Sequence, residues 1–162
     1  MVRLTKSRVL AGTLWLGVLI LAGVGYWRTG LGRAASLESF GAAPAFALTD
    51  QFERPVASDD FRGKVVVANF VYTNCRDICP LLSLRMQQLQ ERLQSEGLLG
   101  SRVQLLSFTV DPAHDTPSVL REYSAKHQAD ADAWRFLTGP PDQVVPLIVD
   151  GFHLGVVALP PA

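Results

Sequence analysis

The two cysteines of the chain, Cys75 and Cys79, are the residues best suited to carry chemistry. Pro80 follows directly, and proline is favoured in the first turn of a helix. The amide groups at a helix N-terminus carry partial positive charge, which stabilises a thiolate. A thiolate is both the nucleophile of disulfide exchange and a soft ligand for Cu(I). The pair therefore predicts a redox site or a copper site.

The spacing of the pair leaves several chemistries open. Thiol-disulfide oxidoreductases usually carry one residue fewer between their cysteines than the three found here. Residues i and i+4 share a helix face, so both sulfurs could converge on one metal, whereas an extended loop would allow a disulfide. A structural disulfide over so short a loop would be a weak staple. Two inert buried thiols are a further alternative, and zinc would need more ligands than two.

The elements that would position the cysteines alternate between strands and helices. Residues 65–72 form a β-branched and aromatic run that predicts a strand buried on both faces, and residues 103–110 predict a second buried strand. The remaining elements are expected as a strand at 46–50, a short turn or single helical turn at 58–64, a helix at 118–127, a strand at 134–137 and a helix at 141–150.

A helix is also expected between the two buried strands. It begins near Pro80, and glycines at 97 and 100 end it. Its apolar stripe comprises Leu82, Met86, Leu89 and Leu93. Alternating strands and helices indicate a parallel α/β sheet with crossover connections. The cysteines then lie at the carboxyl end of a central strand, where ligands bind in open α/β sheets.

The N-terminus predicts a membrane anchor. Residues 9–27 carry no charge and would rise about 28 Å as a helix, close to the thickness of the bilayer core. We expect a cytoplasmic N-terminus at 1–8, a transmembrane anchor at 9–27, a linker at 28–45 and a domain at 46–162. A cleaved signal peptide is the alternative, and a buried soluble helix is a third. Both leading interpretations place the domain outside the cytoplasm, where thiols must be managed.

Composition argues against one class of partner. The formal net charge is zero, and like charges form no long run, so nucleic-acid binding is not expected.

Three ordered motifs in residues 42–155 resemble the Sco/SenC family. They are residues 69–80 (NFVYTNCRDICP), residues 108–117 (FTVDPAHDTP) and residues 134–139 (WRFLTG). The resemblance implies a thioredoxin-like domain on a single-pass anchor in the inner (cytoplasmic) membrane, facing the periplasm or the cell exterior. It also implies a copper chaperone, handling Cu(I) and also Cu(II), that assembles the dinuclear copper centre of cytochrome c oxidase. The partner would be the copper-accepting subunit of that oxidase.

The family's functional residues map onto particular positions. Its two metal cysteines correspond to Cys75 and Cys79, and its Asp-Pro loop corresponds to Asp111 and Pro112. Its third ligand, a histidine, lies beyond the region equivalent to residues 151–155, near a β-hairpin that a terminal helix follows. The resemblance therefore predicts a truncated copy that lacks the C-terminal hairpin and helix. Such a domain would be marginally stable.

Other polar residues have simpler explanations. His153 is expected at the surface, His114 in solvent, and His127 at a helix end whose dipole it suits. Met86 is expected in the core. Turn and helix-cap roles account for the acidic pairs Asp59 and Asp60, and Asp111 and Asp115.

Two functions of different classes remain. A metallochaperone would hold Cu(I) between Cys75 and Cys79 and pass it on by ligand exchange. A thiol-disulfide oxidoreductase would reduce the acceptor's cysteines, one thiolate attacking and the other resolving the mixed disulfide. The wider spacing and the set of motifs favour the metallochaperone, so whether the chain is an enzyme stays open.

Overall fold

The strands of the domain form a single mixed sheet with the order β2-β1-β5-β4-β3. The structure, a computed structural model, describes residue 17, residues 39–75 and residues 78–155. The sheet belongs to the compact unit that begins at Ala42. Its strands are β1 (Ala47–Asp50), β2 (Pro55–Ala57), β3 (Val65–Val71), β4 (Val103–Thr109) and β5 (Trp134–Thr138).

The helices follow the order predicted from the sequence. A 3-10 turn and two helices lie between strands: η1 (Ser58–Phe61), α2 (Ile78–Ser95) and α3 (Pro117–Lys126). Helix α4 (Pro141–Pro146) follows β5, and a π-helical turn, η2 (Leu147–Gly151), extends it. Gly97 has a φ of 68°, a left-handed conformation that glycine adopts at little cost, and this ends the helical path of α2. The short strand β2 was not predicted.

The strands that carry the motifs run parallel. Val65 lies opposite Val103, and the register continues to Val71 opposite Thr109, so β3 and β4 end together. β4 pairs with β5 in the same sense, whereas β1 pairs antiparallel with both β5 and β2. The carboxyl ends of β3 and β4 therefore meet at one edge, as the sequence predicted for the cysteine loop.

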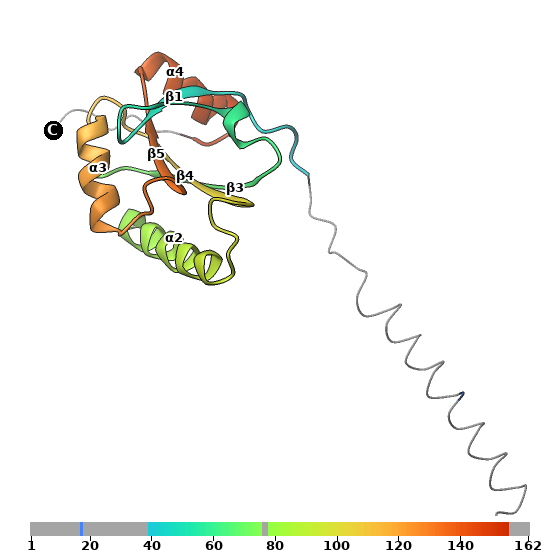
Figure 1. Cartoon of the computed structure of the whole chain (residues 1–162). Coiled ribbons are helices and arrows are strands. Elements are labelled where there is room, and N and C mark those ends of the chain that lie inside the picture. The colour runs from blue at the N-terminus through green and yellow to red at the C-terminus, as the bar shows by residue number, and fades with distance from the viewer. Residues whose placement is uncertain (1–16, 18–38, 76–77, 156–162) are drawn as a thin grey trace, which may run out of the picture. The chain divides into compact units, whose positions relative to one another are not determined.

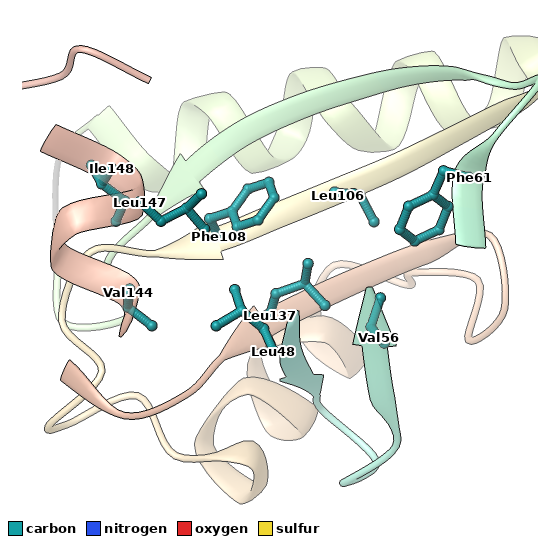
Figure 2. Packing of buried hydrophobic residues seen from close by; sticks show 9 residues of the cluster. All are labelled: Leu48, Val56, Phe61, Leu106, Phe108, Leu137, Val144, Leu147 and Ile148. Atoms are coloured by element: carbon teal, nitrogen blue, oxygen red, sulfur yellow. The ribbon is translucent and has the colours of Figure 1, made fainter. Parts of the chain in front are cut away.

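Two hydrophobic clusters cover opposite faces of the sheet. Because side chains alternate along a strand, Leu105 of β4 points into one cluster and Leu106 into the other. Figure 1 shows α2 and α3 on one side of the strands and α4 on the other. The cluster on the α4 side is seen in Figure 2 and consists of Leu48, Val56, Phe61, Leu106, Phe108, Leu137, Val144, Leu147 and Ile148.

The burial of β3 differs from the prediction. The sequence predicted a strand buried on both faces, but Val65 is 63% exposed and Val66 is 39% exposed. β3 is the last strand in the sheet order, and within the described residues nothing pairs with its outer edge. A β-branched run satisfies an edge strand and a central strand equally well, so the pattern did not separate them.

The predicted stripe of α2 is confirmed at three of its four positions, because Met86 is buried and Leu89 and Leu93 are partly buried against the hydrophobic cluster on the α2 side of the sheet. Leu82 is exposed, and the fully buried positions of the helix are Cys79, Ser83, Met86 and Gln90. These positions follow the same helical spacing. The first buried position of the helix is therefore a cysteine.

The predicted membrane anchor at residues 9–27 lies outside the described residues, apart from residue 17. Within the part of the chain that the structure describes, no helix is long and apolar enough to cross a membrane.

Candidate functional site

The two cysteines stand at the junction between β3 and α2. A tight turn follows β3, in which the Cys75 amide donates a hydrogen bond to the Tyr72 carbonyl oxygen at 3.0 Å. Cys79 lies in the first turn of α2 as the structure describes it and is 7% exposed, whereas Cys75 is partly exposed. Residues 76 and 77 between them lie outside the described residues. Cys75 is therefore the more exposed and Cys79 the more buried of the two cysteines.

The side chains of Cys75 and Cys79 interact with each other as thiols, with no disulfide between them in this structure. Burial raises the pKa of the Cys79 thiol, and a hydrogen bond with Cys75 raises it further, while a backbone hydrogen bond with Tyr72 acts in the opposite direction. The sequence predicted a thiolate stabilised by the start of a helix. At Cys79 desolvation outweighs that effect, so this thiol holds its proton more tightly than an ordinary cysteine.

The loop after β4 reaches the cysteine loop. The Val110 amide donates to the Val71 carbonyl oxygen at 2.9 Å, which continues the parallel ladder past the end of β4. Asp111 begins a turn in which its carbonyl oxygen accepts from the amides of His114 and Asp115 at 3.2 and 2.9 Å. This turn directs Asp115 back towards the end of β3.

Asp115 is the most heavily bonded side chain at this edge. Its carboxylate is fully buried and accepts a 2.6 Å hydrogen bond from the Thr109 hydroxyl and a 3.3 Å bond from the Thr73 amide. The Thr73 hydroxyl donates to its other oxygen, and His114 Nδ1 lies 3.0 Å from that same oxygen. The acidic residue of the second motif thus binds the loop that carries Cys75.

The histidines do not complete a preformed metal site with the cysteines. In the described residues, no group of three or more His, Cys, Asp or Glu side chains is placed to hold a metal ion. His153 is exposed with a φ of 56°. His114 is exposed, as expected, and its ring also contacts Thr73 and Asp115. The donors that lie together are two soft sulfurs, a set that fits Cu(I) better than it fits zinc.

His127 lies at the C-terminal end of α3, as predicted, but its surroundings disfavour the charged form of its ring. Burial lowers the pKa of its imidazole, and the charge of Lys126 adds to this effect. Its ring lies against that of Tyr123, with centroids 4.6 Å apart. Desolvation therefore outweighs the favourable helix dipole at this position.

Met86 and the first acidic pair have the structural roles predicted for them. Met86 is 6% exposed within the α2-side cluster. The Asp60 carboxylate accepts a hydrogen bond from the Ala57 amide at 2.9 Å, and Asp59 pairs with Arg62 at 2.9 Å. These contacts stabilise η1, so the two aspartates have a structural role there.

Sequence reasoning undervalued Asp115 and did not single out Thr73. Both belong to the quoted motifs, and each lies in the loop after one of two neighbouring parallel strands. The expected topology already brings those loops together, so a carboxylate in one and a hydroxyl in the other were candidates for direct contact. The contact could have been predicted from the fact that the two loops are neighbours, whereas the residue types alone do not indicate it.

Comparison with known proteins identifies a family and several relatives. The family model described as SCO1/SenC matches residues 35–158. The SCO1 protein homolog of Bacillus subtilis is 36% identical over 94 residues, which are 58% of this chain and 47% of that protein. The chain therefore spans about half the length of this curated relative.

Solved structures agree on the fold. BsSco, described as a member of the Sco family of cytochrome c oxidase assembly proteins with a disulfide switch, is 30% identical with a TM-score of 0.65. That match covers 74% of this chain and 69% of BsSco. Yeast Sco1 with copper bound is 26% identical with a TM-score of 0.64, over 75% of this chain and 64% of that one. These similarities confirm the thioredoxin-like α/β fold.

Proposed function

This chain belongs to the SCO1/SenC family, and from that premise we propose that it binds copper for the assembly of cytochrome c oxidase. The observation that supports this most directly is the contact between the two thiols, Cys75 and Cys79, at the start of α2. Relatives of this fold include a structure with copper bound and a family of oxidase assembly proteins. Copper is here the cargo of the protein, to be passed to the copper-accepting subunit.

The site suits transient binding of Cu(I). Thiolates are soft ligands, and both must lose their protons before they bind, so copper loading releases protons. Cys75 is partly exposed and is the sulfur that an incoming thiol from the acceptor would approach first. Cys79 is buried and would hold the metal while the ligands exchange.

Copper competition tests the assignment. The reduced full-length chain is titrated against a Cu(I) chelator, together with the variants Cys75→Ser, Cys79→Ser and His153→Ala. We expect about one Cu(I) per chain, loss of binding in either cysteine variant, and little change in His153→Ala. Equal copper binding by a folded variant that lacks both cysteines would refute the proposal.

Thiol-disulfide exchange is the second candidate, and the contact between the two thiols favours it as well. In this reaction the Cys75 thiolate attacks a disulfide of the acceptor and releases one acceptor thiol. Cys79 then attacks the mixed disulfide, which releases the second acceptor thiol and leaves a Cys75–Cys79 disulfide. The acceptor gains the two electrons that the pair loses.

The two candidates differ in what one cysteine alone does. A Cys79→Ser variant would accumulate a mixed disulfide with an oxidised acceptor if exchange operates. Copper transfer requires both sulfurs and gives no such adduct. Mass spectrometry of the variant mixed with the oxidised acceptor domain distinguishes them.

The location of the domain is part of the same proposal. We infer that residues 9–27 anchor the chain in the inner membrane and that the cysteines lie outside the cytoplasm. A reporter that is active only in the cytoplasm, fused after Ala162, should be silent, and one active only outside should work. The reverse pattern would refute this topology.

A further inference from the structure

We propose that Asp115 is a positioning residue of the cysteine loop and that it acts through Thr73. This inference rests on the proposed function only in that the cysteine pair is taken as the working site. The two loops it joins follow β3 and β4, which are adjacent in the sheet. Thr73 lies two residues before Cys75, inside the turn that the Cys75 amide closes onto Tyr72.

The chemistry of Asp115 explains why its contacts must be maintained. A buried carboxylate is costly unless hydrogen bonds replace its lost hydration. Its two oxygens meet two hydroxyls, one backbone amide and one imidazole nitrogen, which together match the acceptor capacity of an ionised carboxylate. Movement of Thr73 would remove two of these donors at once.

Two hydrogen bonds to Asp115 restrain Thr73. It is held through both its backbone and its side chain, so both the path of the chain and the rotamer are fixed. Thr109, at the end of β4, holds the same carboxylate from the rigid side of the sheet at 2.6 Å. The position of β4 is thereby transmitted through Asp115 to the turn that carries Cys75.

His114 completes this network on the solvent side. Nδ1 of His114 lies 3.0 Å from the Asp115 oxygen that also accepts a hydrogen bond from the Thr73 hydroxyl. The side chain of His114 is 47% exposed while that of Asp115 is fully buried. The ring therefore lies between Asp115 and water and limits hydration of the carboxylate.

Because the loop is restrained, the Cys75 thiol stays close to the Cys79 thiol, which raises the effective concentration of each thiol for the other. Two groups held in a productive geometry react or bind as a unit, and loosening either of them lowers that advantage. A mobile Cys75 would therefore disfavour both the Cys75–Cys79 disulfide and a copper ion held by two sulfurs. Loss of the hydrogen bonds between Thr73 and Asp115 should therefore lower both the equilibrium constant for disulfide formation and the affinity for copper.

The test uses the full-length chain with Thr73→Val and Thr73→Ser. Each is equilibrated with glutathione disulfide, which oxidises the two thiols to a disulfide and is reduced to two glutathione thiols. Thr73→Val, which lacks the hydroxyl, should lower the equilibrium constant for oxidation about tenfold, as expected for loss of a hydrogen bond to a charged group. Thr73→Ser keeps the hydroxyl and should stay within about twofold of the parent.

Asp50→Asn is the matched control. Asp50 is also a fully buried carboxylate, and it accepts hydrogen bonds from the amides of Phe52 and Arg54 at 2.8 and 2.9 Å. It belongs to β1, which is not adjacent to β3. Its substitution should reduce the stability of the fold and leave the redox equilibrium unchanged, which separates positioning from general stability.

The outcomes separate this proposal from the copper proposal. A folded Thr73→Val variant with an unchanged equilibrium, or a Thr73→Ser variant shifted as far as Thr73→Val, overturns the positioning role even if copper binds normally. The predicted redox shift in a chain that binds no Cu(I) supports positioning and refutes the metal function. If Thr73→Val does not fold, Thr73→Ala compared with Thr73→Ser carries the same test.

Discussion

The hydroxyls of Ser83 and Tyr123 lie 2.9 Å apart in a buried contact that joins α2 to α3. Ser83 is one helical turn beyond Cys79, so this contact fixes the helix that carries the inner cysteine. Burial raises the pKa of the Tyr123 hydroxyl, and the charges of Cys79 and Cys75 add to this effect. The pair therefore links the packing of two helices to the cysteine site.

Removing one hydroxyl of this pair should cost more than removing both. Tyr123→Phe leaves the Ser83 hydroxyl buried without its partner, which costs about 1–3 kcal/mol of unfolding free energy. The double variant Tyr123→Phe with Ser83→Ala should recover part of that loss. Urea denaturation of the four chains of this cycle measures the coupling, and strictly additive losses would contradict a direct interaction.

The reactivity of Cys79 should depend on Cys75. The pKa of Cys79 is raised by burial and also by its hydrogen bond and charge interaction with Cys75. A raised pKa keeps the thiol protonated, so its alkylation rate should rise at a higher pH than for an ordinary cysteine. In Cys75→Ala, loss of those two contributions should move the pH profile of Cys79 to lower pH.

Alkylation with iodoacetamide, followed by peptide mass spectrometry, gives that pH profile. The variant His153→Ala is the control. The side chain of His153 is exposed, and the described residues contain no metal-binding group of three or more side chains that would include it, so the pH profile of Cys79 should not change. A profile of Cys79 that stays in place when Cys75 is removed would mean that Cys75 does not contribute to the pKa of Cys79.

The stability of the domain should fall in mild acid because of His127. Burial lowers its folded-state pKa, whereas the unfolded state binds a proton near pH 6.5, its ordinary value. Below about pH 6.5 the unfolded state therefore holds more protons, and stability decreases by at most about 1.4 kcal/mol per pH unit from this group. Above that range the contribution is fully present.

Replacement of His127 by Asn removes this titration. Its unfolding free energy should change less between about pH 7 and pH 5 than that of the parent chain, measured by urea denaturation at each pH. His153→Asn serves as the control, since that ring is exposed. Equal pH dependence in the parent chain and His127→Asn would assign the acid sensitivity to other groups.

The order and type of most helices and strands could be predicted from the sequence, but the order of the strands in the sheet could not. Residues 103–110 read as a buried strand, and β4 is buried because β3 and β5 flank it. Residues 65–72 read the same way, yet β3 is an edge, because local β propensity does not record which strands pair. The buried face of α2 also includes Ser83 and Gln90, which are polar residues that an apolar pattern does not select.

The sequence allowed the pair of cysteines to be proposed as the candidate site, but it did not predict the hydrogen-bond network beside them. Their order, helix position and motif context were local properties of the chain. The contacts of Asp115 with Thr73 span 42 positions and depend on the parallel register of β3 and β4. The raised pKa of Cys79 likewise depends on burial by elements distant in sequence, which no local pattern reports.

The exposed edge of β3 should promote association of the chain with itself. Its sequence, VVVANFV, contains no charged residue and no proline, the features that usually protect an edge strand. Within the described residues its outer backbone groups have no strand beside them. Val65→Lys places a charge on this edge at a position that is 63% exposed, so the free energy of unfolding should change by less than about 0.5 kcal/mol.

Sedimentation and light scattering over a range of concentrations measure the effect. Val65→Lys should reduce concentration-dependent association, because a charge must be desolvated before another strand pairs there. Val145→Lys adds the same charge at a 40% exposed valine that belongs to helix α4 rather than to a strand, and should change association much less. If both variants reduce association equally, net charge rather than the β3 edge governs it, and the edge has no special role.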